Sequence, residues 1–295
     1  MTLPAWDFSS ACPARDLLEM DQIGPLHFRA RHNQPNHNRM LFGGQALAQA
    51  MAAAQRTLPD WPAHNCNAYY LRSGRIEEPV DYEVEQLRDG RRYAARRVRA
   101  AQGGRAIFEM LCSFHHPEIG FAHQRHDTMD VPDPTSLPSL ASFVVENAYR
   151  LPGEIVDRYS GPFPIEVRLI QPDCVFFQRL PTPHRDFWMR MPSAEQVTQP
   201  GDHQSLLAFL SDYWLAGVAA ASHRSPITAD GFSIVSLNHS LWFHAPARAD
   251  QWLLYRSESP WAGDGRGIAR ALLFDQNGTL VASVVQEAAM REPGS

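Results

Sequence analysis

The stretch Ser205–Ser222, SLLAFLSDYWLAGVAAAS, decides how the rest of the chain is interpreted. It is apolar almost all round, which predicts a buried helix of roughly four or five turns, with one charge, Asp212, in its middle. The positions three and four residues from Asp212 are all apolar: Ala208, Phe209, Leu215 and Ala216. An isolated Asp on a helix is usually a surface residue at the edge of a partial apolar stripe. We favour the alternative, a central core helix that presents one acid to a cleft, where the carboxylate needs a partner.

The composition is that of a folded protein with an ample apolar core. The chain has 295 residues, of which 44% are hydrophobic and 20% charged, enough for one large domain or two of ordinary size. A net charge of -5 argues against general nucleic-acid binding, which needs a basic excess. All 27 basic residues are Arg, which excludes lysine chemistry and indicates a GC-rich bacterial genome. The stretch Ser205–Ser222 is too short, and too charged at its centre, for a membrane span.

The two ends of the chain and the cysteines indicate a cytoplasmic protein. Residues 1–20 contain no basic start followed by an apolar run, so we expect no secretory signal. The C-terminal Pro293-Gly294-Ser295 does not resemble a peroxisomal address. No CxxC or other close spacing joins the four cysteines, so we expect free thiols in a reducing compartment at Cys12, Cys66, Cys112 and Cys174.

The first half combines short strands with one alanine-rich helix. The helix opens at Phe42-Gly43-Gly44-Gln45 and continues as ALAQAMAAAQR, a run of strong helix propensity. Before it we expect a short helix, a strand and a polar loop, at 14–22, Pro25–Ala30 and His32–Arg39. After it come four strand-like runs, at Asn67–Leu71, Asp81–Arg88, Tyr93–Ala101 and Arg105–His115. Asp89-Gly90 and Gly103-Gly104 are tight-turn signals, which predict that the last three runs form an antiparallel meander.

Gly43 and Gly44 allow the backbone at the start of the alanine-rich helix to approach another group closely. A helix N-terminus presents free N–H groups to anions or carbonyl oxygens. Plain packing of the helix against a sheet is the other interpretation of the same small residues. The helix carries no acid, and its only polar residues before its end are Gln45 and Gln49.

Five arginines cluster in the predicted meander: Arg91, Arg92, Arg96, Arg97 and Arg99. Such a run is usually the solvated face of a strand, which is the interpretation we favour. The alternative is a site for a phosphorylated ligand.

A proline-rich segment, 117–164, separates this half from the next. Only Ser139–Arg150 looks helical within it, so we interpret the segment as a linker wrapped on the surface. Its prolines include Pro132, Pro134, Pro138 and Pro162. Beyond it we expect strands on both sides of Ser205–Ser222, at Ile165–Leu169, Phe187–Met191, Ser236–Phe243, Gln251–Ser259, Gly267–Phe274 and Leu280–Met290.

The order strand, apolar helix, strand, three-strand meander therefore occurs twice. The sequence repeats it faintly, with Ala94-Ala95-Arg96-Arg97-Val98 beside Ile268-Ala269-Arg270-Ala271-Leu272. Repetition on this scale indicates a duplicated domain, in which an antiparallel sheet wraps around one central helix. That shape is the hotdog. We predict an α+β double hotdog, with an N-terminal unit at 1–116, the linker at 117–164 and a C-terminal unit at 165–295.

Several sequence blocks resemble the type II acyl-CoA thioesterases. They are Leu41–Gln45, Leu87–Gly90 with Ala95–Val98, Ser236–His244, and Ala282–Glu287 with Met290-Arg291. The likeness runs in order from about Pro25 to Arg291. It implies a double hotdog that hydrolyses fatty-acyl-CoA thioesters without a metal or cofactor. The chain departs from the family at Asn238, often Asp there, and at Asn67-Ala68 and Arg72-Ser73-Gly74, where the family has His-Ser and Arg-Pro-Gly.

The resemblance also implies a catalytic trio. The family has an Asp on the second central helix, a Thr or Ser on the next strand and a Gln on the last strand, which match Asp212, Ser236 and Gln286. Thioester hydrolysis needs a held water, an acceptor for its proton and donors for the oxyanion. Burial can raise the proton affinity of an Asp, and Ser and Gln can fix a water without adding charge. Taken singly, Ser236 would be a structural hydroxyl and Gln286 an ordinary edge residue. We expect substrate contacts from Gly43, Gly44, Gln45 and His239.

Other site chemistries fit the spacing less well. There is no Gly-x-Ser-x-Gly, so His239-Ser240 is not the signal of a serine hydrolase. The histidines at His115-His116 and at His123 with His126 lack a coherent ligand set, so we expect no metal site. Gly263-x-Gly265-x-Gly267 is not the dinucleotide-binding pattern.

Two alternatives to the hydrolase remain open. One is a hotdog enoyl-CoA hydratase, which would need an Asp/His pair, with His223 as the candidate partner of Asp212. The other is a non-catalytic acyl-CoA-binding protein. Because only the second helix carries an acid, we expect one working site per chain, which the first unit helps to bind or shape. The expected partners are an acyl-CoA substrate and further copies of the chain, as a dimer or tetramer of double hotdogs.

Overall fold

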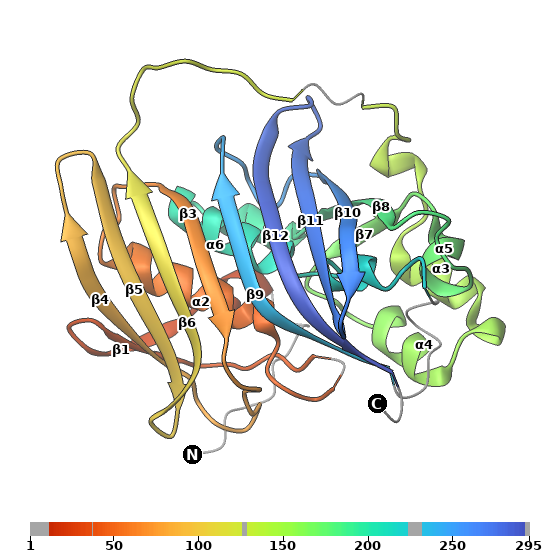
Figure 1. The fold of residues 1–295 in the computed structure, drawn as a ribbon, viewed down its shortest axis with the longest axis horizontal. Helices are drawn as coiled ribbons and strands as arrows, with labels where there is room; N and C mark the ends of the chain where they lie inside the picture. The colour runs from red at the N-terminus through yellow and green to blue at the C-terminus, as the bar shows by residue number, and fades with distance from the viewer. Residues whose placement is uncertain (1–11, 37, 126–128, 224–231, 293–295) are drawn as a thin grey trace.

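Two central helices and one large antiparallel sheet make up most of the fold (Figure 1). The computed structural model describes residues 12–36, 38–125, 129–223 and 232–292. Within these residues the sheet has twelve strands, in the order β1-β2-β4-β5-β6-β3-β9-β12-β11-β10-β8-β7. Figure 1 shows it curving in front of helices α2 (Gly43–Arg56) and α6 (Pro200–Ser211).

Each half of the sheet has the same layout. The first half comprises β1 (Met20–Gly24), β2 (His27–Ala30), β3 (Ala63–Tyr70), β4 (Asp81–Asp89), β5 (Tyr93–Gln102) and β6 (Arg105–His115). The second comprises β7 (Glu166–Leu169), β8 (His184–Arg190), β9 (Ser233–Phe243), β10 (Leu253–Gly263), β11 (Arg266–Asp275) and β12 (Leu280–Arg291). The predicted meander β4-β5-β6 is confirmed, and β10-β11-β12 repeats it.

The halves join edge to edge through β3 and β9, around a local two-fold relation. Asn67 stands opposite Ser240 at the centre of this pair, and the pair Cys66 with Leu241 is mirrored by Ala68 with His239. The same relation matches β6 to β12, β5 to β11 and β4 to β10. The α+β double hotdog predicted from the sequence is therefore confirmed.

The arginines of the two meanders match differently from the faint sequence repeat. Glu85 pairs with Arg97 across β4 and β5, as Glu258 pairs with Arg270 across β10 and β11. Because successive side chains of a strand point to opposite faces, Arg97 and Arg270 both point outward. Arg96 points inward instead and is 1% exposed. The sequence alignment that set Arg96 beside Arg270 was therefore wrong by one residue.

The two central helices lie side by side and antiparallel. Helix α2 is rich in Ala and free of β-branched residues, which favours a helix, and Gly44–Gln55 are all buried. At its start, a Cβ added to Gly44 would lie 2.9 Å from the Phe209 carbonyl oxygen of α6. At its end, Gln55 Nε2 donates to Gln204 Oε1 at 3.0 Å. Small residues thus let the two helix backbones meet closely.

The long helix predicted over 205–222 is wrong in its second part. Helix α6 begins at Pro200, ends at Ser211 and is capped by Asp212; a short 3-10 turn, η4 (Ala216–Ala219), follows. Trp214 has a φ of 61°, a left-handed conformation that a right-handed helix cannot contain. The aromatic rings after Asp212 pack against rings of the segment 117–164. The ring centroids of Tyr213 and Phe163, for example, are 5.6 Å apart. This tertiary packing overrides the helix propensity, so Asp212 stands at a helix end and not in mid-helix.

The segment 117–164 contains more structure than the sequence predicted. The expected helix is α3 (Leu140–Glu146) followed by the 3-10 turn η2 (Ala148–Arg150), but α4 (Gly153–Ser160) and, further on, α5 (Pro172–Phe176) were missed. The apolar residues of α4, Ile155, Val156 and Tyr159, pack against the core while partly exposed, and this face was not recognised within the proline-rich segment. Figure 1 places these helices beyond β7 and β8, at one edge of the sheet. The limits of the two units, 1–116 and 165–295, stay a prediction.

Two smaller points concern the ends of elements and the thiols. The expected helix over 14–22 is only α1 (Pro13–Leu18), because Met20–Gly24 pairs with β2 as strand β1. All four cysteines are free, as expected. Among the described residues, no helix is both long and apolar enough to cross a membrane.

Candidate active site

Asp212 lies where the end of α6 meets the start of α2. Its side chain is 5% exposed, and its Oδ1 accepts a 2.6 Å hydrogen bond from Gln286 Nε2. The backbone N–H of Gly44 also donates to the carboxylate. A Cβ added to Gly43 would lie 3.1 Å from Asp212 Oδ2. The acid therefore belongs to the second unit but faces the N-terminus of the helix of the first, where a negative charge is stabilised.

One side-chain amide links Asp212 to Ser236. Gln286 Nε2, on β12, lies 2.6 Å from Asp212 Oδ1 and 2.9 Å from Ser236 Oγ on β9. Because a carboxylate only accepts hydrogen bonds, the amide must turn its NH₂ group toward Asp212. Ser236 Oγ then accepts from the amide, which leaves the serine proton for another acceptor. The structure thus brings together the three residues that the family resemblance implied.

A β-bulge turns Ser236 toward the inner face of the sheet. His239 points into the core opposite Gln286, so strict alternation along β9 would turn Leu237 inward and Ser236 outward. The register of β9 with β12 shifts between the pairs Asn238 with Glu287 and Ser236 with Ala288, and Leu237 is the extra residue. Ser236 consequently stands opposite the buried Ala288 and takes the inward position.

His239 is fully buried behind Asp212. Its Nδ1 is 3.8 Å from Asp212 Oδ1, and its Nε2 is 2.9 Å from Ser211 Oγ. Ser211 Oγ donates its single proton to the Ala208 carbonyl oxygen, so Nε2 of the histidine carries the proton in that contact and Nδ1 is an acceptor. Burial lowers the pKa of His239 to about 3, which keeps the ring neutral. His239 therefore packs behind the acid without a hydrogen bond to it, and the direct substrate contact expected of it stays a prediction.

Burial sets the proton affinity of the acid. It raises the pKa of Asp212 to about 7, against the opposing effect of the hydrogen bonds from Gln286 and the Gly44 backbone. A carboxyl group with a pKa near neutrality can take a proton in one step and return it in the next. Gln286 Oε1 is buried and has no partner within the described part of the chain, so the site contains an open acceptor beside the acid. These groups can hold and deprotonate a water molecule.

Comparison with known families decides what kind of protein this is. Residues 31–115 match the family model described as the acyl-CoA thioesterase N-terminal domain, and residues 134–290 match that of the C-terminal domain. Together they span well over half of the chain. The chain belongs to the acyl-CoA thioesterase family.

Its relatives carry the same description. The chain is 34% identical to acyl-CoA thioesterase 2 of Haemophilus influenzae, over 93% of this chain and 96% of that protein. It is 32% identical to acyl-coenzyme A thioesterase 8 of Rattus norvegicus, over 93% and 88% of the two chains. The acyl-CoA thioesterase II TesB2 from Mycobacterium marinum has a similar structure, with a TM-score of 0.76, 31% identity and coverage of 95% and 99%. The protein is thus a thioester hydrolase of the type II acyl-CoA thioesterase family, as the sequence predicted.

In this thioesterase the side chain of Gln45 is occupied within the protein. Its Nε2 donates to the His32 carbonyl oxygen at 2.6 Å, and its Oε1 accepts from the backbone N–H of Gln34. It also contacts Gln49 at 3.2 Å and is fully buried. Gln45 therefore holds the loop before α2 in place. Its expected contact with the substrate stays a prediction.

The arginine cluster of the first unit forms mainly a solvated face. Arg92 pairs with Glu118, Arg97 with Glu85 and Glu109, and Arg99 with Glu83, all partly exposed. Arg91 and Arg92 border a shallow hollow with Arg88 and Tyr93 at the β4–β5 turn. Arg96 is the exception to the favoured interpretation, because its buried guanidinium donates to Thr57 Oγ1 at 2.8 Å.

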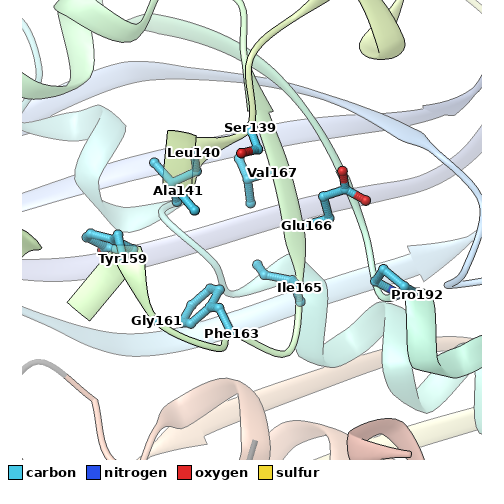
Figure 2. A pocket seen from close by; sticks show the side chains of 10 residues that line it. All are labelled: Ser139, Leu140, Ala141, Tyr159, Gly161, Phe163, Ile165, Glu166, Val167 and Pro192. Carbon is cyan, nitrogen blue, oxygen red and sulfur yellow. The ribbon is translucent and has the colours of Figure 1, made fainter. Parts of the chain in front are cut away.

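A separate pocket of about 270 Å³ lies between α3, α4 and β7 (Figure 2). Apolar side chains from these elements line much of it, and Glu166 lies on its polar side. Tyr159 and Phe163 line it, and their rings also contact those of Trp214 and Tyr213, the residues that follow Asp212. An aromatic layer thus separates this pocket from the acid.

Proposed function

We propose that Asp212, Ser236 and Gln286 are the catalytic residues, and that the enzyme hydrolyses fatty-acyl-CoA to the free acid and CoA. The observation that carries the assignment is the single amide of Gln286, which bonds both Asp212 and Ser236 beside a nearly buried carboxylate. A carboxyl group whose pKa burial raises to about 7 suits a general base at neutral pH.

The proposed route needs neither a metal nor a cofactor. Ser236 and Gln286 hold a water beside Asp212. The water oxygen attacks the thioester carbonyl carbon while Asp212 takes one water proton, and the carbonyl oxygen becomes an oxyanion. The intermediate then collapses with cleavage of the C–S bond. The leaving thiolate takes the proton from Asp212, which restores the carboxylate and releases CoA and the fatty acid.

The start of α2 lies on the other side of the reacting atoms in this proposal. Asp212 Oδ1 is held by Gln286, so Oδ2, which faces Gly43, is the oxygen that accepts the water proton. The lack of side chains at Gly43 and Gly44 brings the start of α2 close to Asp212 and Tyr70. Gln45 fixes the preceding loop and His239 fills the core behind the acid, so both contribute to substrate binding indirectly.

The division into an N-terminal unit (1–116), a connecting segment (117–164) and a C-terminal unit (165–295) belongs to the same proposal. Each chain then has one working site, because the second unit supplies the acid and the first shapes the cleft. We further propose that the enzyme acts in the cytoplasm as a dimer or tetramer of double hotdogs.

An enoyl-CoA hydratase would need a histidine that reaches the substrate beside the acid. No hydrogen bond or ion pair joins His223 to Asp212 within the described residues, and the histidine that does approach the acid, His239, is fully buried. The hydrolase is therefore the better supported of the two activities. A binding protein without turnover would have no use for an acid with a pKa near neutrality.

The decisive experiment incubates the purified full-length chain with acyl-CoAs from short to long chain length in the presence of a thiol reagent. Steady release of CoA, with the same amount of free acid, supports the hydrolase. Addition of water to an enoyl-CoA without thiol release would support the hydratase. Stoichiometric binding with no product would support the non-catalytic alternative.

A further inference from the structure

The hydroxyl group of Tyr70, at the end of β3, is buried without a hydrogen-bond partner in the described part of the chain. Leaving a buried hydroxyl unpaired costs stability, because the group loses its bonds to water and gains none. The ring itself is held in place, with its centroid 5.3 Å from that of Phe108. An unpaired donor is thus held fixed at this position at a cost in folding stability.

Tyr70 lies beside the proposed site. A Cβ added to Gly43 would lie 2.9 Å from Tyr70 Cε1, 3.2 Å from Cζ and 3.1 Å from Asp212 Oδ2. The end of the phenol ring and the outer oxygen of the acid therefore both pack closely against Gly43, at the start of α2. A thioester that meets a water held by Asp212 must come close to both groups.

Three other donors beside Asp212 are already engaged. The two amide protons of Gln286 point to Asp212 and to Ser236, and the Gly44 N–H points to Asp212. The free proton of Ser236 is the one that holds the water. A developing oxyanion requires donors fixed in advance where its charge appears. Tyr70 presents such a donor.

The matching position of the other unit supports a role in chemistry. The two-fold relation that makes Leu241 the counterpart of Ala68 makes Phe243 the counterpart of Tyr70, two residues further along each strand. Phe243 has the same ring without the hydroxyl, and the residue that caps α2 in the position of Asp212 is Thr57. The hydroxyl thus occurs at the end that contains Asp212.

We propose that Tyr70 is a further catalytic residue, whose hydroxyl donates a hydrogen bond to the thioester carbonyl oxygen and to the oxyanion that forms from it. This inference rests on the proposed thioester hydrolysis at Asp212. No proton is transferred, and the tyrosine keeps its proton throughout. Burial and the nearby Asp212 raise the pKa of Tyr70 well above its ordinary value, so the phenol is a neutral donor at working pH.

The test compares Tyr70→Phe with Tyr82→Phe in the full-length enzyme, using decanoyl-CoA and a thiol reagent. Tyr82 is the matched control, because its buried hydroxyl donates to Gln49 Oε1 at 2.8 Å, away from the acid. Removal of one oxyanion donor lowers kcat by about 10²–10³ in known cases. We expect a fall of about 10² for Tyr70→Phe with an unchanged or higher Tm. We expect Tyr82→Phe to lower Tm and to keep kcat within about twofold.

A binding measurement separates this role from a structural one. Two unreactive ligands are compared: an acyl-CoA whose sulfur is replaced by methylene, which keeps the carbonyl, and an alkyl-CoA thioether, which lacks it. Tyr70→Phe should weaken the carbonyl ligand by about 2- to 12-fold, the worth of one ordinary hydrogen bond, and leave the thioether unchanged. Equal effects on both ligands, or normal kcat, would overturn the role of Tyr70. Failure of the wild-type enzyme to release CoA would instead overturn the proposed function, whatever Tyr70→Phe does.

Discussion

The two hotdog units have the same strand arrangement, including a β-bulge at matching positions of β3 and β9, but they carry different side chains at that bulge. In β9, Leu237 is the extra residue of a bulge, and Ser236, the residue before it, points inward. In β3 the matching bulge is at His64, and the residue before it is the buried Ala63. Gln286 stands opposite His239, as Cys112 stands opposite Cys66. The bulge is therefore a property of the repeated fold, and only the second unit uses it to present a hydroxyl.

The polar groups of the two units are also treated differently. In the first, the cap residue Thr57 is bonded by Arg96, and burial raises the pKa of the Cys66 thiol to about 12, so neither of these two residues can act as a base. In the second, the cap residue is Asp212 and the open acceptor Gln286 Oε1 lies beside it. Chemistry is expected beside Asp212, where the buried Gln286 Oε1 is left without a partner among the described residues.

The largest effect that would test this difference comes from removing the acid. Asp212→Asn keeps the shape of the side chain but cannot accept the water proton, so kcat should fall by about 10²–10⁴. Folding stability at pH 8 should not fall, because the change removes a nearly buried charge. Steady-state CoA release and thermal unfolding measure the two quantities. Normal turnover, or failure to fold, would contradict the catalytic assignment.

The shared amide predicts that Ser236 and Gln286 act as one unit. Ser236→Ala and Gln286→Ala should each lower kcat by about 10², and the double variant should lose less than the product of the two. The physical reason is that either change already releases the water that both residues hold. A full double-mutant cycle on kcat measures this coupling. Strictly multiplicative losses would mean that the two side chains work independently.

The contribution of the first unit is tested at the start of α2. In Gly43→Ala, the new Cβ would lie 2.9 Å from Tyr70 Cε1 and 3.1 Å from Asp212 Oδ2, so one of them must move. Small displacements of reacting groups are costly, and kcat should fall by about 10- to 10²-fold. Gly153→Ala is the control, because its Cβ would have no atom within 4 Å. Equal activity of both variants would remove the first unit from the site.

The protonation state of Asp212 predicts how activity depends on pH. Only the carboxylate accepts the water proton, so kcat/KM should fall by about tenfold per pH unit below a pKa of about 7 and be level above it. Stability should show the opposite trend. A folded-state pKa raised above that of the unfolded chain means that the stability present at low pH is lost as pH rises toward and through 7. In Asp212→Asn, both dependences should disappear from this window.

The sequence predicted the repeated architecture because the meanders leave clear signals. Tight-turn glycines and alternating strands mark each meander. The family resemblance identified Asp212, Ser236 and Gln286 as candidate catalytic residues. The end of α6 could not be predicted, because Trp214 leaves the helix to pack its ring against others far along the chain. Ser236 lies on the inner face because of a bulge in β9. The bulge depends on how β9 pairs with β12, and the residue pattern of β9 alone does not show that pairing. Arg96 was misread for a related reason, since a charged residue in a strand is usually outward.

Substitution of Arg96 is expected to have the smallest effect on catalysis. It tests whether the matching end of the first unit takes any part in the chemistry. Its matching position in the second unit is Ala269, so Arg96→Ala gives the first unit the residue of the second. The change removes a fully buried side chain that bonds Thr57 and Asp89, so unfolding free energy should drop by about 2–5 kcal/mol. Arg97→Ala, next in sequence but exposed and paired only at the surface, should cost no more than about 1 kcal/mol. Both variants should keep kcat within about twofold at a temperature where they are folded. A stable Arg96→Ala enzyme with strongly reduced kcat would show that the matching end of the first unit takes part in the chemistry after all.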